Sequence, residues 1–310
     1  MSSPAPVTDA PAPLETGGDE PATPDGWRDS GSRTLTTLRA ELDRIDDAVH
    51  DLLIERAGVV ERVAQAGKRG ALRPGREAAI IRRLLARHRG GLPAHTVVRL
   101  WRELLAGTTS MQGGFSVAVC APPEGGTLFV QIAREHFGAL TPLRTHRSPA
   151  QAIGEVSAGS AAVAVLPLPS GTEEPRDAWW TALLHKDEPR IHVVGRLPFW
   201  HPRPEGAPDV QAFIIAAVAP DASGADRSLL GLELPLDVSH ARLTAALTAA
   251  GFEPSQIILR RDPGATAADA LADVDGFVAD DDPRLGNLAT VLRRPVVLGA
   301  YAIQVDGKIA

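Results

Sequence analysis

The chain has 310 residues, of which 44% are hydrophobic and 23% are charged, and its net charge is −6. This length suggests two or three domains with buried cores, and the acidic balance argues against a general nucleic-acid-binding protein. The one cysteine, Cys120, cannot form a disulfide within the chain, and no run of 18 apolar residues predicts a membrane span. We therefore expect a cytoplasmic protein that binds neither nucleic acid nor membrane.

Residues 1–32 predict a disordered tail. They are rich in proline, alanine, serine, glycine and acidic residues, which cannot bury enough apolar surface to offset the entropy of ordering. The tail lacks the basic and apolar regions of a signal peptide, and it is too acidic for a transit peptide.

A long helix is predicted next. Its apolar residues recur at heptad spacing, at Leu35, Leu38, Leu42, Ile45, Val49 and Leu52. The pattern continues to Val63, which gives about 50 Å of helix at about 1.5 Å per residue. Because the core of one chain rarely needs so long a helix, we expect this helix to pack along a helix of a second chain.

Two shorter helices follow. Pro74 is well placed in the first turn of the second helix. Pro93 opens the third helix, which we expect to run to about Gln112, where two glycines end it. Together the three helices predict an all-α domain over residues 33–113.

Polar side chains interrupt the apolar stripes of these helices. On a helical wheel, Arg56 and Glu77 lie within the stripes of the first and second helices, and Arg76 lies at the edge of the second. Thr108 and Gln112 lie inside the stripe of the third helix. Since an unpaired buried charge is costly, these residues need partners. Two interpretations stay open: a structural network of ion pairs, or a pocket for a small anion.

The basic run over residues 72–90 holds six arginines. Arg82 points away from the apolar stripe, and we expect both Arg82 and Arg89 to be solvated. The run therefore does not predict a surface for a polyanion.

After Gly114 the pattern becomes α/β. Strands are predicted at "FSVAVCA", "AAVAVLPL", "RIHVVGRL" and "QAFIIAAVA", and a helix at "LFVQIAREHFG". These elements predict an α/β domain over residues 114–222.

From residue 223 the pattern restarts as βαββαβ. Its elements are the strand "LLGLELPL", the helix "ARLTAALTAAG", the strands "QIILRR" and "GFVAD", the helix "RLGNLATVL" and the strand "VVLGAYA". Residues 223–310 therefore predict a small α+β domain of the ferredoxin-like kind.

The helical segments "LRAELDRIDDAVHDLLIER", "RPGREAAIIRRLL" and "LPAHTVVRLWRELLAGTTSMQ" resemble the all-helical chorismate mutases. The resemblance implies an intertwined homodimer that converts chorismate to prephenate without a cofactor or a metal. This rearrangement requires a site that holds a flexible dianion in a compact shape and stabilises charge on the ether oxygen.

The resemblance also implies a set of site residues. Arg39 would reach across the dimer, and Arg56 and Arg76 would bind the carboxylates and neighbouring groups of the substrate. Glu77 would accept the hydrogen bond of the ring hydroxyl.

Further site positions differ from the family pattern. Thr108 stands where the family often has serine, and Gln112 matches a glutamine that donates to the ether oxygen. The family lysine that also donates to this oxygen is replaced by Gly67, so Lys68, one residue later, is the candidate donor. Arg73 stands where the family has an aspartate.

Residues 115–310 resemble a prephenate dehydratase domain followed by an ACT regulatory domain. The resemblance rests on "CAPPEGGTLFVQIAREHFG" in the first part and on the βαββαβ pattern in the second. The Thr-Arg-Phe motif of the dehydratases corresponds to Gln211, Ala212 and Phe213, and a glutamine cannot act as the acid that dehydration needs. We therefore expect a degenerate dehydratase-like and ACT-like region.

These features predict a cytoplasmic, homodimeric chorismate mutase. One alternative is a bifunctional chorismate mutase and prephenate dehydratase. The other is a catalytically inactive protein that senses an acid of the aromatic pathway.

Overall fold

The computed structural model describes residues 26–66, 72–185, 187–289 and 292–306. By its internal contacts the chain divides into two compact units after Val59, and each is described by itself. The predicted boundaries after residues 32, 113 and 222 remain predictions. Residues 1–25 of the predicted tail lie outside the described residues, and the first helix begins at Gly26, inside the range predicted as tail.

The first unit contains most of the helix α1 (Gly26–Gln65), which is 40 residues long. All the predicted heptad residues are exposed. Their exposed fractions are 56% for Leu35, 50% for Leu38, 59% for Leu42, 42% for Ile45, 50% for Val49 and 64% for Leu52. The long helix is confirmed, and it presents an apolar stripe along its length.

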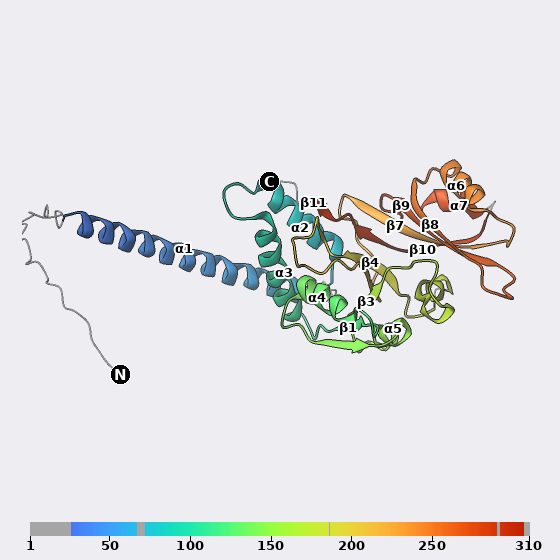
Figure 1. Ribbon diagram of the computed structural model, residues 1–310, viewed down its shortest axis with the longest axis horizontal. Coiled ribbons are helices and arrows are strands. Elements are labelled where there is room, and N and C mark those ends of the chain that lie inside the picture. The colour runs from blue at the N-terminus through green and yellow to red at the C-terminus, as the bar shows by residue number, and fades with distance from the viewer. Residues whose placement is uncertain (1–25, 67–71, 186, 290–291, 307–310) are drawn as a thin grey trace, which may run out of the picture. The chain divides into compact units, whose positions relative to one another are not determined.

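The second unit holds the other elements (Figure 1). Its α-helices are α2 (Pro74–Arg87), α3 (Ala94–Ser110), α4 (Gly126–Phe137), α5 (Pro149–Ser157), α6 (His240–Ala249) and α7 (Pro283–Ala289). Two 3-10 helices are η1 (Pro175–Asp177) and η2 (Trp179–His185). Its first six strands are β1 (Val117–Cys120), β2 (Leu143–His146), β3 (Val163–Pro167), β4 (His192–Leu197), β5 (Trp200–His201) and β6 (Ala212–Ala216). The others are β7 (Asp226–Leu234), β8 (Pro254–Arg260), β9 (Ala268–Asp275), β10 (Arg293–Ala302) and β11 (Val305–Asp306).

One mixed sheet of nine strands runs through the second unit in the order β2-β1-β3-β6-β4-β10-β7-β9-β8. In Figure 1 it extends from the green β1 to the orange β8 and β9. β1 pairs in parallel with β2 and β3, and β6 is antiparallel to β3 and β4. The strands β10, β7, β9 and β8 are antiparallel to one another along this order. Their order and the two helices α6 and α7 confirm the predicted βαββαβ arrangement.

The two halves of the sheet meet where β10 pairs in parallel with β4, at Gly299 and Val193. Gly299 has φ +145, and a Cβ there would lie 2.0 Å from the carbonyl oxygen of Val193. Only glycine permits this approach of the two strands.

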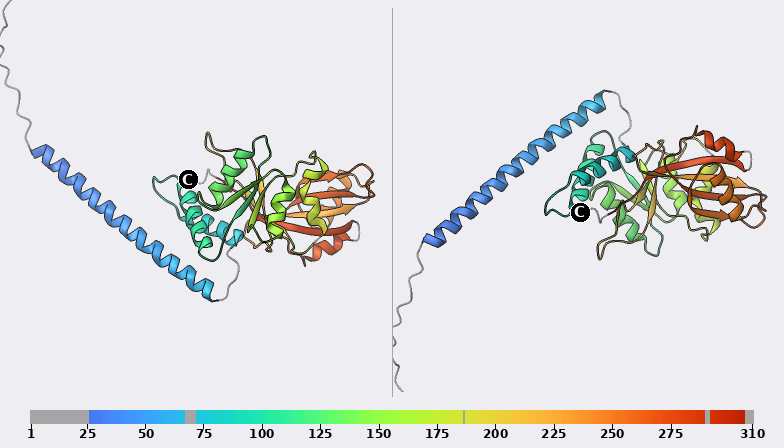
Figure 2. Two further views of the ribbon diagram at one scale, coloured as in Figure 1. Left: turned by 90° about the horizontal axis from the view of Figure 1, so that it is seen from below. Right: turned by 90° about the horizontal axis from the view of Figure 1, so that it is seen from above.

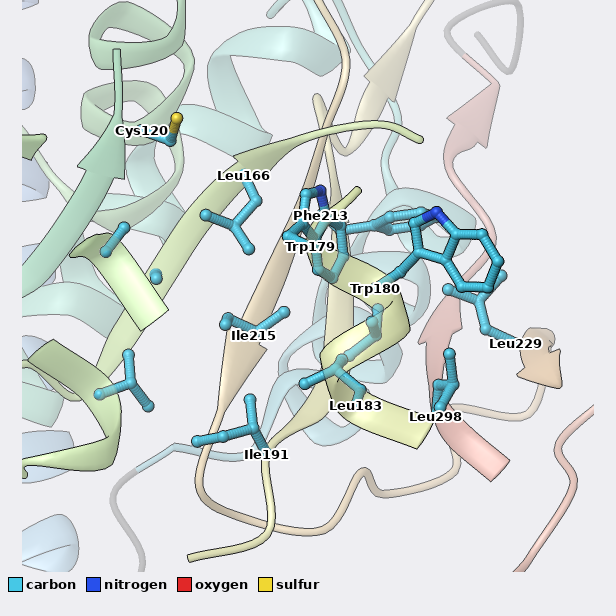
Figure 3. Packing of buried hydrophobic residues seen from close by; sticks show 14 of the residues in the cluster. Cys120, Leu166, Trp179, Trp180, Leu183, Ile191, Phe213, Ile215, Leu229 and Leu298 are labelled. Carbon is cyan, nitrogen blue, oxygen red and sulfur yellow. The ribbon is translucent and has the colours of Figure 1, made fainter. Parts of the chain in front are cut away.

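Helices cover both faces of the sheet. Phe129 and Ile132 of α4 pack into one core, whereas Ala152 and Val156 of α5 pack with η2 into another, on the opposite face. Figure 3 shows the second core around the indoles of η2 and Phe213. The third core lies between the antiparallel strands and the pair α6 and α7.

One predicted strand is wrong. Residues 276–280 ("GFVAD") follow the strand, and β9 is instead formed by Ala268–Asp275. The sequence "ADALADVD" mixes small and acidic residues, so its apolar signal is weak, but β9 pairs on both edges, with β7 and β8. Hydrogen bonding to a strand on each side therefore makes Ala268–Asp275 a strand despite its weak apolar signal. The strand β2 and the helix α5 had not been predicted.

The helices α2 and α3 pack against the α/β half (Figure 2). Ile81 and Leu85 share a core with Phe199, Trp200 and Val305. The three-helix segment is therefore not an isolated bundle: its second and third helices are built into the compact unit that carries the sheet.

An aspartate of the α/β half caps α2. The carboxylate of Asp221 accepts hydrogen bonds from the backbone N–H groups of Gly75 and Arg76, at 2.9 and 3.1 Å. The residue at the N-cap position, Arg73, offers no side-chain cap and instead lies 3.4 Å from the same carboxylate. The free N–H groups of the first helical turn are satisfied from outside the helix.

The expectation that Arg82 is solvated is wrong. Its guanidinium donates hydrogen bonds to Ser223 Oγ at 2.8 Å and to the carbonyl oxygens of Ala225 and Ile303, at 3.0 and 2.6 Å. The face of α2 that lies outside the apolar stripe is covered by loops of the α/β half, which the sequence of the helix does not show.

Candidate active site

The centre of the candidate site is a carboxylate held between two helices. Arg102 of α3 donates a hydrogen bond from Nη1 to Oε2 of Glu77 on α2, at 3.0 Å. The two side chains are 5% and 16% exposed, respectively. Glu77 therefore lies inside the apolar stripe of α2, as predicted, and its partner comes from the neighbouring helix.

Side chains of the α/β half complete the surroundings of Arg102. Its Nη1 also lies 3.3 Å from Nε2 of His136 on α4, and its guanidinium stands 4.7 Å from the ring centre of Phe199. Burial lowers the pKa of Arg102 to about 10, against the opposing effect of Glu77, so the guanidinium remains charged at neutral pH. Burial, with the charge of Arg102, holds the pKa of His136 well below its usual value. His136 is therefore neutral at pH 7.

The carboxylate of Glu77 keeps one oxygen open. Burial raises its pKa, and Arg102 acts in the opposite direction. Within the described part of the chain, Oε2 is bonded to Arg102 and no hydrogen bond is found for Oε1. A carboxyl oxygen without a partner can accept a hydrogen bond, so Oε1 is available to a hydroxyl group.

Thr108 lies in the last turn of α3, and Gln112 follows the end of this helix. Thr108 is buried, and its hydroxyl group donates to the carbonyl oxygen of Leu104 at 2.9 Å, which leaves its oxygen lone pairs as acceptors. The exposed Gln112 lies just beyond the end of α3, and its Nε2 is 3.5 Å from the carbonyl oxygen of Thr108. This amide is held weakly.

Arg76 lies beside Glu77 in sequence but is exposed. Its backbone N–H is bonded to Asp221, and its side chain projects from the first turn of α2. The structure thus brings Glu77 together with Arg102 and leaves Arg76 at the surface.

The remaining predicted residues belong to α1 and to the segment after it. Arg39 is exposed on α1, and Arg56 is half-buried, which lowers its pKa. Lys68 and Gly67 lie outside the described residues.

Arg102 and His136 are the parts of this arrangement that the sequence did not indicate. On the helical wheel Arg102 lies about 40° beyond Val98, the edge of the apolar stripe, at about 100° per residue. An arginine at that position is typical of a helix surface. It is buried because α4 and Phe199 cover that side of α3, and the sequence of α3 alone holds no signal of this contact.

A cleft lies in the α/β half, at the carboxyl ends of β1 and β3, and has an open volume of about 720 Å³. Its walls include Arg147, Ser170 and Arg176. Such crevices are the usual ligand sites of open α/β sheets. Gln211 is exposed and directly precedes the nearby strand β6, and its Oε1 accepts a hydrogen bond from Arg196 at 2.5 Å. An amide in this state supplies no acidic proton.

The helical segment matches a known family. Residues 38–113 match the model of the family described as chorismate mutase type II. Residues 38–113 are a type II chorismate mutase domain. The matched range includes α2, α3 and most of α1. The prediction of a mutase domain followed by an α/β region is confirmed, and the structure shows one large mixed sheet in that region.

Curated relatives of the mutase-containing chain are described as bifunctional chorismate mutase/prephenate dehydratase. The protein of Stutzerimonas stutzeri is 28% identical over 147 residues, which cover 45% of this chain and 40% of that protein. The protein of Neisseria gonorrhoeae is 34% identical over 112 residues, covering 34% of this chain and 30% of that one. This chain thus spans less than half the length of the relatives it matches.

Among solved structures, prephenate dehydratase from Streptococcus mutans is similar with a TM-score of 0.46 and 15% identity. The similarity covers 61% of this chain and 98% of that chain. None of the helices described for this chain is both long and apolar enough to cross a membrane.

Proposed function

We propose that this chain catalyses the rearrangement of chorismate to prephenate through its mutase domain. The observation that carries the proposal is the family match over residues 38–113. It is supported by Glu77, whose carboxylate is fixed by Arg102 with one oxygen open. We place this activity in the cytoplasm, because the single cysteine is free and buried.

The proposed reaction requires the protein only to hold the substrate in a compact shape and to stabilise its charge. One carbon–oxygen bond of the ether bridge breaks while one carbon–carbon bond forms within the same molecule, so no group leaves and no proton is transferred. The Oε1 atom of Glu77 would accept the hydrogen bond of the ring hydroxyl. Arg56 and Arg76 would bind the two carboxylates, since guanidinium groups bind carboxylates with two parallel hydrogen bonds. Holding the compact conformer in this way removes much of the entropic part of the barrier.

The other proposed residues would act near the ether oxygen. Gln112 would donate to it, and Thr108 would line the site from α3. A fixed donor at a position where charge develops is worth about 3–4 kcal/mol in the barrier. Lys68 is proposed as a second donor at this position.

The site would be completed by a second copy of the chain. The apolar stripe of α1, from Leu35 to Leu52, is exposed over its whole length. A second α1 helix with the same heptad pattern would cover it as in a coiled coil. In such a homodimer Arg39 would lie on the helix that the partner contributes.

Two alternatives remain distinct from this proposal. The names of the relatives favour a second, dehydratase activity, and the cleft beside β1 and β3 offers a place for it, but Gln211 lacks the acid that the reaction needs. The exposure of Arg76 favours an inactive protein that binds an acid of the pathway without converting it.

A single assay distinguishes the proposed mutase activity from the two alternatives. Purified full-length chain is mixed with chorismate, the loss of its ultraviolet absorbance is followed, and the products are separated by chromatography without acid treatment. We expect chorismate to be lost faster than without protein and prephenate to accumulate. Enzymatic formation of phenylpyruvate would establish the bifunctional alternative. A rate equal to the uncatalysed rate would contradict the proposal and leave the sensing protein.

A further inference from the structure

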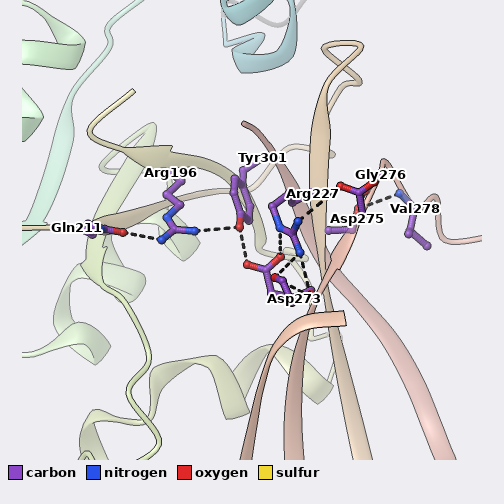
Figure 4. A network of polar contacts seen from close by, with 10 residues as sticks. Arg196, Gln211, Arg227, Asp273, Asp275, Gly276, Val278 and Tyr301 are labelled. Atoms are coloured by element: carbon purple, nitrogen blue, oxygen red, sulfur yellow. Dashed lines mark hydrogen bonds and ion pairs between the residues drawn. The ribbon is translucent and has the colours of Figure 1, made fainter. Parts of the chain in front are cut away.

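A polar network crosses the sheet where its two halves meet (Figure 4). Arg196 on β4 donates a hydrogen bond from Nη1 to the hydroxyl oxygen of Tyr301 on β10, at 3.2 Å. The hydroxyl group of Tyr301 donates to Oδ2 of Asp273 on β9, and Arg227 on β7 donates from Nε to Oδ1 of the same carboxylate, at 2.6 Å. Four strands from both halves of the sheet therefore contribute one residue each.

The charges of this network are not balanced at its Arg196 end. Arg227 is paired with Asp273 and lies 3.5 Å from Asp275. Arg196, in contrast, has only neutral partners among the described residues, namely the hydroxyl of Tyr301 and the amide oxygen of Gln211. Burial and the neighbouring Asp273 raise the pKa of Tyr301, so its hydroxyl stays protonated and cannot serve as the counter-ion.

Arg196 also has unused donors. A guanidinium group carries five N–H donors, and the two hydrogen bonds occupy one on each Nη atom. Its Nε is buried without a hydrogen-bond partner in the described part of the chain. One N–H on each Nη remains, and a guanidinium group can bind a carboxylate through one N–H of each Nη.

An open pocket is lined by Arg196. It has a volume of about 410 Å³, and Arg227 and Tyr301 also line it. Pro202, Ile303 and Val305 supply apolar wall. Asp306 also lines the pocket and is exposed, so solvent and salt screen its charge. A pocket of this size with apolar walls and a fixed cation suits a small organic acid.

We propose that this pocket binds a small monocarboxylic acid with an apolar body. Its carboxylate is held by the free Nη donors of Arg196, and its body lies between the ring of Tyr301 and Ile303. The site contains none of the proposed mutase residues, and it does not depend on the proposed mutase activity. A ligand here bridges β4 and β10, which are otherwise paired at the single Gly299–Val193 register position.

The single tyrosine of the chain makes the proposal directly testable. Full-length protein is prepared with ring-13C tyrosine, so that the labelled signal comes from Tyr301, and it is titrated with sodium benzoate at constant ionic strength. We expect a saturable shift of the Tyr301 signal with a dissociation constant of roughly 1 mM, the range open to so small a ligand. Benzamide, a neutral molecule of the same shape, serves as the ligand control.

Three variants define the outcome. Arg196→Gln is expected to weaken benzoate binding at least about tenfold, which corresponds to about one bidentate charge-assisted pair. Ile303→Asp, at a 38%-exposed wall position that tolerates a polar residue, is expected to abolish binding without loss of fold. Arg99→Gln, an exposed arginine of α3, should bind as the wild type does. The proposal is overturned if benzoate gives no saturable shift up to about 20 mM. Equal shifts with benzamide, or unchanged binding in folded Arg196→Gln or Ile303→Asp, overturn it as well.

Discussion

Glu77 and Arg102 form an ion pair of 3.0 Å between α2 and α3, and the α/β half of the chain closes over the arginine. The pair links the mutase domain to the α/β half, because Arg102 also contacts His136 of α4. The arginine that holds Glu77 is thus itself in contact with residues outside the helices of the mutase domain.

Removing Arg102 is expected to destabilise the protein strongly. Arg102→Ala leaves the carboxylate of Glu77 desolvated and unpaired, which costs about 3–5 kcal/mol when the pair is well buried. The double variant Glu77→Leu with Arg102→Leu should cost less, because it leaves no unpaired charge. Urea unfolding followed by circular dichroism measures both. Equal stability of Arg102→Ala and the wild type would contradict the role given to this pair.

The stability of the protein should depend on pH through His136. The pKa of His136 is well below its usual value in the folded state, whereas the unfolded chain has a histidine pKa of about 6.5. Between these values the unfolded state binds a proton that the folded state excludes. The contribution is therefore complete above about pH 6.5 and is lost as pH falls toward the folded pKa, with a slope of at most about 1.4 kcal/mol per pH unit.

The comparison that isolates this effect uses His136→Asn. The free energy of unfolding of wild type and variant is measured at about pH 7.5 and about pH 5.5. We expect the wild type to lose more stability than the variant on acidification. Parallel pH profiles would show that His136 binds its proton equally well in both states.

Two helical glycines should respond in opposite directions to alanine. A Cβ at Gly75 would lie 2.0 Å from the backbone carbonyl oxygen of Asp221, whereas nothing lies within 4 Å of a Cβ at Gly107. Gly75→Ala should therefore displace the start of α2 and cost about 1–3 kcal/mol or more. Gly107→Ala should stabilise the protein by about 0.5–1 kcal/mol, because alanine favours the helix. Thermal unfolding of the two variants is the measurement, and a stable Gly75→Ala would mean that α2 does not dock on Asp221.

The oligomeric state should depend on one face of α1. Ile45→Lys places a charge in the exposed apolar stripe, and we expect it to shift a dimer toward monomer by at least about tenfold in the dissociation constant. Asp47→Lys is the matched control. Residues two positions apart in sequence lie about 200° apart around a helix, so Asp47 faces away from Ile45. Sedimentation equilibrium over a range of concentrations compares the two. A wild type that is monomeric at all concentrations, or an Ile45→Lys protein that dimerises as the wild type does, would contradict the proposed homodimer.

The sequence predicted the features that arise within one element. The heptad pattern predicted α1, and the position of Glu77 among isoleucines and leucines predicted a buried carboxylate. The βαββαβ order was also predicted, although one of its strands was placed at the wrong residues. In each case the signal lies in a short window of the chain.

The features that the sequence did not predict arise from contacts between distant segments. Arg82 and Arg102 have the positions of surface arginines on their helices, and both are bound because the α/β half covers them. Asp221 caps α2 from far along the chain. The weakly apolar β9 is a strand because it pairs on both edges. Such contacts require the assembled fold, so periodicity alone could not show them.

Two arginines of α1 test the proposed chorismate site directly. Arg56 is the half-buried residue proposed to bind the substrate, and Arg62 is exposed on the same helix. The value of kcat/KM for chorismate is measured for the wild type, Arg56→Ala and Arg62→Ala, with circular dichroism as the check on folding. We predict at least about a hundredfold loss for Arg56→Ala, the effect of removing one charged clamp from a preorganised site, and less than about twofold for Arg62→Ala. Full activity in folded Arg56→Ala would contradict the proposed substrate site.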